Sequence, residues 1–82
     1  MVQAFVLVQT EVGRATAVAQ QIEAVDGVVS AEAVVGPYDV IARADGATDA
    51  DVADIVSRIQ KVGAITRTLT CPVAPRPAGS VR

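Results

Sequence analysis

The pattern of apolar and polar residues changes its period twice in the first third of the chain. Over residues 2–9 (VQAFVLVQ) apolar residues fill one face of a strand, while Phe5 and Leu7 lie on the other. The first face carries Val2, Ala4, Val6 and Val8. Both faces of this strand are therefore expected to be covered.

Residues 14–25 follow a helical period instead. One stripe collects five apolar residues, and Asp26-Gly27 supplies a stop signal after it. The stripe consists of Ala15, Val18, Ala19, Ile22 and Val25. The spacing predicts an amphipathic helix that lies on a sheet.

Two strand-like runs follow, and they are separated by a turn signal. Residues 28–35 (VVSAEAVV) are rich in β-branched side chains, and residues 39–45 (DVIARAD) alternate less cleanly. Between them, Gly36 tolerates unusual backbone geometry and Pro37 cannot donate to a strand ladder. The pattern predicts a hairpin.

The second helix has a clear start. Thr48 and Asp51 resemble a capping box, and Asp49, Asp51 and Asp54 fall near the positive end of the helix. Gly63 is the predicted stop. The apolar stripe consists of Val52, Ile55, Val56, Ile59 and Val62.

Residues 64–73 are then predicted to form a last strand, in which Pro72 fits at a sheet edge or a strand end.

The order strand, helix, strand, strand, helix, strand predicts an α+β fold of the ferredoxin-like split βαβ type. Right-handed crossovers place both helices on one face of a four-stranded antiparallel sheet. The other face would stay bare and expose either Phe5 and Leu7 or the opposite set of the first strand. We therefore expect two sheets to pack face to face in a homodimer.

Composition limits the class of protein. The chain has 82 residues, 51% of them apolar, and a formal charge of −2, which favours one small domain over residues 1–73. A Pro/Gly/Ser tail over residues 74–82 is expected to be mobile. A domain this small is marginal alone, so oligomerisation is expected. No apolar run is long enough to cross a bilayer, so we expect a cytoplasmic location. No stripe of clustered Lys and Arg is present that would bind nucleic acid.

The candidate chemistry is that of binding rather than catalysis. Gly36, Tyr38 and Asp39 place a phenol and a carboxylate at the turn, and Thr66, Thr68 and Thr70 place hydroxyls two residues apart on the last strand. These groups suit a small polar ligand but include no strong nucleophile. The same residues also fit an ordinary turn and the polar side of an edge strand.

Other residues have simpler interpretations. The sequence has no histidine, and Cys71 is its only cysteine, so a metal cluster or cofactor is not expected and the thiol is expected to be structural. The three aspartates near residue 50 are explained by helix capping. Arg67 points away from the threonine hydroxyls and fits an interface or solvent contact.

Three segments together resemble a known family. They are Phe5-Val6-Leu7-Val8, the turn Val35-Gly36-Pro37-Tyr38-Asp39-Val40, and the run from Ile59 to Thr70 (IQKVGAITRTLT). Their order and spacing resemble the ligand-binding (RAM) domain of the Lrp/AsnC transcriptional regulators, over residues 2–73. Members normally carry an N-terminal helix-turn-helix domain, which this sequence lacks before its first strand, so it resembles a stand-alone effector domain.

The resemblance implies sheet-to-sheet dimers, further assembly into rings of four dimers, and amino-acid binding near the contacts between dimers. By position, it implies ligand contacts from Gly36, Tyr38, Asp39, Thr66, Thr68 and Thr70. Asp39 would take the ammonium group of the amino acid, while hydroxyls and amides near Gly36 would take the carboxylate and Tyr38 would cover the side chain.

Two classes of function stay open, with a third beside them. The first is a non-enzymatic sensor that modulates transcription, in partnership with a full-length Lrp/AsnC regulator. The second is a small dimeric α+β barrel enzyme, such as a monooxygenase or an isomerase, in which Tyr38 and Asp39 would transfer protons. The third is an assembly module without a ligand. Sensing is the interpretation that the residues favour.

Overall fold

The computed structural model describes residues 1–74 of the chain and has the predicted order of elements. The strands are β1 (Val2–Thr10), β2 (Val28–Ala33), β3 (Val40–Gly46) and β4 (Ile65–Pro72), and the helices are α1 (Ala15–Glu23) and α2 (Asp49–Ile59). Apart from residue 74, the predicted tail lies outside the described residues. Neither helix is long and apolar enough to cross a membrane.

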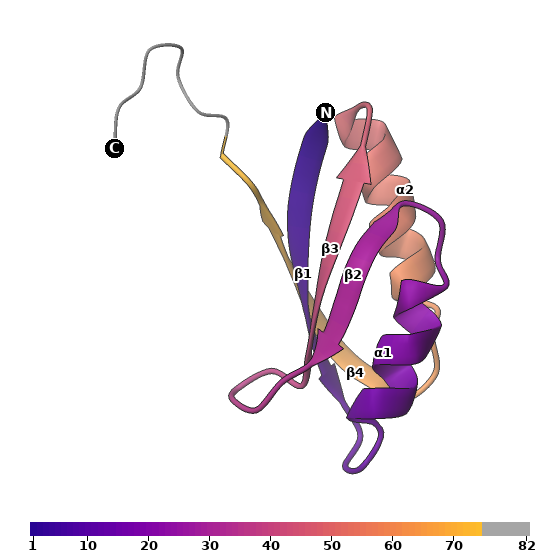
Figure 1. The fold of residues 1–82 in the computed structure, drawn as a ribbon, viewed down its shortest axis with the longest axis vertical. Helices are drawn as coiled ribbons and strands as arrows, with labels where there is room; N and C mark the ends of the chain where they lie inside the picture. Colours follow the sequence, from indigo (N-terminus) through magenta and orange to yellow (C-terminus); the bar gives the residue numbers. More distant parts are fainter. Residues whose placement is uncertain (75–82) are drawn as a thin grey trace.

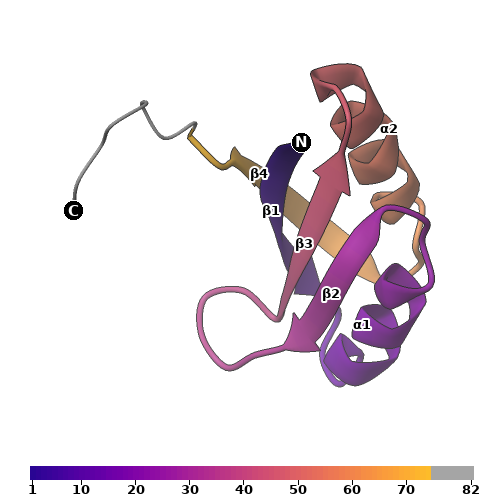
Figure 2. The same ribbon diagram turned by 45° about the horizontal axis from the view of Figure 1, so that its top comes forward.

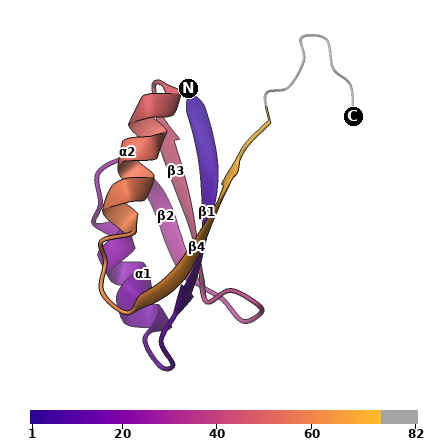
Figure 3. The same ribbon diagram turned by 180° about the vertical axis from the view of Figure 1, so that it is seen from behind.

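The four strands form one antiparallel sheet in the order β2-β3-β1-β4 (Figure 1). Both helices lie on one side of it, and the view from behind shows the other side uncovered (Figure 3). The predicted ferredoxin-like βαββαβ fold is therefore confirmed. Pro72 lies at the end of the edge strand β4, where a missing N–H donor is tolerated.

The core lies between the helices and the sheet. Alternate residues of the central strands β1 and β3 are completely buried on this side, and apolar residues of α1 and α2 pack against them. The largest fully buried side chains are Val6, Val8, Val18, Ile22, Val40 and Ile59. The core contains no aromatic residue, so small branched side chains supply its packing.

Both helices end earlier than predicted. The apolar stripes continue to Val25 and Val62, and both residues pack on the core, but their N–H groups donate to the residue three positions back rather than four. Each helix thus closes in a tight turn. After α2 the left-handed backbone belongs to Ala64, with a φ of 69°, and not to the predicted stop Gly63.

The start of α2 agrees with the prediction. The hydroxyl of Thr48 accepts the N–H of Asp51, the carboxylate of Asp51 accepts the N–H of Thr48, and both donor–acceptor distances are 3.2 Å. This is a complete capping box. Asp54 pairs instead with Arg58 one turn later.

The uncovered side of the sheet carries an apolar row across three strands. Leu7 on β1 lies opposite Ile41 on β3 and opposite Leu69 on β4. Phe5, two residues before Leu7, is 41% exposed on the same side. The ion pair between Arg43 and Asp45, at 3.4 Å, lies beside this row on β3. We call this surface the open face.

Candidate functional site

The turn between β2 and β3, residues 34–39, is fixed to the end of β1. The N–H of Asp39 donates to the carbonyl of Val8 at 2.9 Å. The carbonyl of Asp39 accepts the N–H of Val34 at 2.8 Å. The side chain of Gln9 donates to the carbonyl of Pro37 at 2.9 Å. The turn projects from the sheet on the side away from the helices (Figure 2). Its position is therefore set by backbone bonds to a central strand.

The carboxylate of Asp39 is directed at β1. Its Oδ2 accepts the backbone N–H of Thr10 at 2.9 Å, so one of its two oxygens is already engaged within the chain. Tyr38 is half-buried, and Gly36 is exposed with no atom within 4 Å of the position that a Cβ would take. The predicted turn residues are thus present as a group, with free space around Gly36.

Two of the predicted threonines lie on the opposite side of the sheet. Thr68 and Thr70 pair with Val8 and Val6, whose side chains point to the helices, so the threonine side chains point the same way. Thr68 accepts a hydrogen bond from Nε2 of Gln60 at 3.0 Å, which ties β4 to the end of α2. Thr66, at the start of the strand, is exposed.

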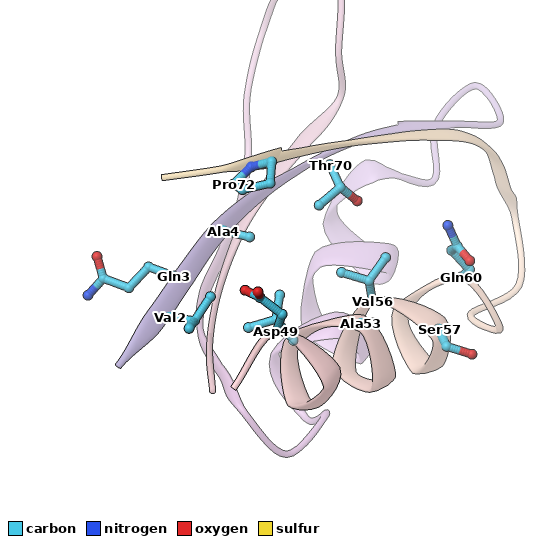
Figure 4. A pocket seen from close by; sticks show the side chains of 11 residues that line it. Val2, Gln3, Ala4, Asp49, Ala53, Val56, Ser57, Gln60, Thr70 and Pro72 are labelled. Atoms are coloured by element: carbon cyan, nitrogen blue, oxygen red, sulfur yellow. The ribbon is translucent and has the colours of Figure 1, made fainter. Parts of the chain in front are cut away.

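A cleft of about 580 Å³ separates α2 from β4 and β1 (Figure 4). Helix α2 packs on β3 and β1, which leaves β4 beyond the helix layer. The walls are mainly apolar, and their polar residues are Gln3, whose side chain points away from the cleft, and Asp49, Ser57, Gln60 and Thr70. Such a cleft suits a small ligand with an apolar part and a hydrogen-bonding part. We call it the α2/β4 cleft.

The chain thus brings together only part of the predicted site. Thr70 lines the α2/β4 cleft and Thr68 lies next along the strand, whereas Gly36, Tyr38 and Asp39 line none of it. The turn and β4 start from the same end of the sheet, but the turn projects away from the helices (Figure 2), whereas Thr68 and Thr70 point toward them. In one copy of the described chain, these two groups do not share a pocket.

Four polar residues of the cleft were not predicted as site residues, and one of them, Gln3, lies on β1. The other three, Asp49, Ser57 and Gln60, line the cleft together with Ala53 from α2 and the residue that caps its C-terminal end. Asp49, Ala53, Ser57 and Gln60 are spaced by four, four and three residues, which makes a second helical stripe next to the buried one. That periodicity is readable in the sequence, but only the position of β4 shows that the stripe faces a cleft.

Within residues 1–74, the acidic groups form no cluster that would hold a metal ion. Two of the three aspartates near the start of α2 have partners in the structure: Asp51 in the capping box and Asp54 with Arg58. Asp49 has its carboxylate at the α2/β4 cleft. Cys71 is exposed on the open face, opposite Phe5, rather than packed as predicted. Its exposure reflects the uncovered face in a single chain.

Comparison with known proteins gives one family match that covers most of the chain. The model of the Lrp/AsnC ligand binding domain matches residues 3–78. No curated protein sequence matches the chain significantly.

Solved structures share the fold. TTHA0845 from Thermus thermophilus is 27% identical, with a TM-score of 0.85, over 94% of this chain and 98% of that one. FFRP-DM1 is 31% identical, with a TM-score of 0.82, over 90% of this chain and 100% of that one. The transcriptional regulator NMB0573 from Neisseria meningitidis, solved with L-methionine, is 17% identical with a TM-score of 0.75. That match covers 99% of this chain and 56% of the regulator.

Proposed function

Since this chain belongs to the family of Lrp/AsnC ligand-binding domains, we propose that it is a non-enzymatic sensor for a small metabolite, most simply an amino acid. The observation that carries the proposal is the α2/β4 cleft, into which the predicted Thr70 projects beside Thr68. The structure of a regulator with L-methionine supports the class of ligand.

The cleft matches the chemistry of an amino acid. Hydroxyl and amide groups of Thr70, Ser57 and Gln60 are neutral hydrogen-bonding partners for a carboxylate, and the apolar wall accepts an aliphatic side chain. Because Gly36, Tyr38 and Asp39 face away from this cleft, we place the complete site between copies, with the turn supplied by a neighbouring chain. Gly36, Tyr38, Thr66, Thr68 and Thr70 remain the proposed contacts, while Asp39 belongs to the same turn with one carboxylate oxygen bonded to the N–H of Thr10.

Assembly is part of the proposal. The open face, with Phe5 and the row Ile41, Leu7 and Leu69, is an apolar surface suited to a second sheet. We propose a homodimer through this face, assembly of dimers into a higher oligomer such as an octamer, and exchange of partners with a full-length Lrp/AsnC regulator in the cytoplasm. A ligand seated between copies would favour the assembly that binds it more tightly.

The test is native mass spectrometry of the purified protein with and without a pool of amino acids that includes L-methionine. A bound amino acid and a changed balance of oligomers are expected. Thr70→Val removes the hydroxyl but keeps the shape, so it should weaken binding by roughly tenfold, as for one lost hydrogen bond. Thr16→Val, an exposed threonine on α1, is the control and should bind normally.

If no amino acid binds, the proposed ligand class is wrong, and an assembly module becomes the better interpretation. If Thr70→Val binds as tightly as the unaltered protein, the ligand does not use the α2/β4 cleft.

The alternative of a small barrel enzyme has little support from the cleft. Asp49 is the only ionisable side chain among its lining residues, so no acid and base face each other there. Turnover of a bound metabolite that is lost in Asp39→Asn or Asp49→Asn would make an enzyme the better interpretation than a sensor.

A further inference from the structure

The end of β1 is held from both sides by two successive backbone amides. The N–H of Thr10 donates to the carboxylate of Asp39 in the turn, and the N–H of Glu11 donates to the carbonyl of Ala64, just before β4. Both donor–acceptor distances are 2.9 Å. Two residues at the end of β1 therefore connect the turn to the start of the threonine strand.

Asp39 is well placed to act as a fixed point. Its backbone N–H and carbonyl are both bonded, to Val8 and Val34, so the residue has little freedom to move relative to the sheet. Gln9 adds a further bond from β1 to the turn through Pro37. A hydrogen bond from Thr10 to an ionised carboxylate is stronger than one to a neutral acceptor.

On the other side of β1, the start of β4 depends on the same residues. The pairing of β1 with β4 shifts its register between Gln9 and Thr10, and Thr10 then pairs with Ile65. Ala64 adopts a φ of 69°, which costs energy in a residue other than glycine and persists only when neighbouring contacts hold it. The bond from Glu11 is such a contact. The position of Thr66 follows from it.

We propose that Asp39 is a positioning residue rather than the group that binds the ammonium of a ligand. Its carboxylate holds Thr10, and through Glu11 and Ala64 it sets where the threonine strand begins relative to the turn. The turn and the strand that carries Thr68 and Thr70, whose side chains face the opposite way, are thereby coupled inside one chain. The link to ligand binding rests on the proposed function, whereas the link from Asp39 to Ala64 does not.

Two substitutions separate the roles. Asp39→Asn keeps a side-chain oxygen that can accept the N–H of Thr10 but has no charge for an ammonium group. Asp39→Ala removes both the side-chain oxygen that accepts the N–H of Thr10 and the charge. Asp26→Ala, an exposed loop carboxylate without a hydrogen-bond partner among the described residues, is the matched control.

Amide hydrogen exchange followed by NMR is the first measurement, made without ligand. In Asp39→Ala, the amides of Thr10 and Glu11 should exchange faster by roughly tenfold or more, as expected for a lost bond to a charged group. The resonances of Ala64, Ile65 and Thr66 should shift in the same variant. Asp39→Asn and Asp26→Ala should stay close to the unaltered protein. Unchanged exchange at Thr10 in Asp39→Ala, or shifts that stop at Thr10, would overturn the proposal.

Titration with L-methionine is the second measurement. A positioning role predicts that Asp39→Asn keeps its affinity within about threefold, whereas Asp39→Ala weakens it by roughly tenfold. Equal losses in both variants, with Thr10 still protected in Asp39→Asn, would show that the charge itself binds the ligand and would refute the positioning role. Failure of the unaltered protein to bind L-methionine would exclude this amino acid as the ligand, and hydrogen exchange would then decide on Asp39.

Discussion

Gly27 shows how a single residue joins two elements of this fold. It has a φ of 92°, which side-chain-bearing residues rarely adopt, and a Cβ there would lie 2.4 Å from the Cδ1 of Ile55 on α2. Its carbonyl also accepts the N–H of Asp45. The absence of a side chain lets the turn after α1 approach α2 directly.

Gly27→Ala should therefore lower the free energy of unfolding by about 1–3 kcal/mol, through backbone strain and overpacking against a buried isoleucine. Urea denaturation followed by circular dichroism at a fixed protein concentration would measure it. Gly13→Ala is the comparison, because Gly13 has a similar φ of 78° but nothing within 4 Å of its Cβ position. If both variants lose the same stability, strain alone explains the effect and the contact with Ile55 does not matter.

At the scale of elements, α2 depends on its capping box. Thr48→Ala removes the acceptor for the N–H of Asp51 and should cost about 1 kcal/mol in the free energy of unfolding. Thr16→Ala on α1 makes the same chemical change without a bond to lose, so it should leave stability unchanged or slightly higher. A loss in Thr16→Ala as large as that in Thr48→Ala would contradict the capping role.

The elements themselves could be predicted because each depends on local period. Alternation put Ala4, Val6 and Val8 together on one face of β1, which the structure shows to be the helix side, and the helical stripes identified Val18, Ile22, Ile55 and Ile59 as core. The ends of the helices could not be predicted in the same way. Val25 and Val62 continue the apolar stripe after the four-residue bonds have stopped, because packing on the core is satisfied by a tight turn as well as by a helix.

The site was predictable only in part, for a related reason. The turn residues and the threonines can be recognised in the sequence by their residue types. Thr10 and Asp39, however, are 29 positions apart and meet only through strand pairing. The α2/β4 cleft exists because β4 lies beyond the helix layer, which no local pattern encodes. Asp49, Ser57 and Gln60 therefore became visible as cleft residues only in the folded chain.

At the scale of the whole molecule, the open face leads to a prediction about assembly. Leu69 is 47% exposed at the edge of the apolar row, so Leu69→Lys would place a charge in a sheet-to-sheet contact with little effect on the core. Light scattering should then give the mass of a monomer where the unaltered protein gives a dimer or larger.

Val12→Lys is the control, because Val12 is fully exposed in the loop after β1 and away from the open face. It should keep the oligomer intact. If Leu69→Lys assembles like the unaltered protein, the copies do not meet through this face.

The position of Tyr38 has a practical consequence. The chain has no tryptophan and one tyrosine, and that tyrosine is half-buried in the turn that Asp39 and Gln9 fix to β1. When excited beyond the phenylalanine band, the intrinsic emission of the protein comes from this one ring. The molecule therefore carries a native optical probe in the turn proposed to meet a neighbouring chain, and a change in its intensity or anisotropy would report docking or ligand arrival in real time without any label.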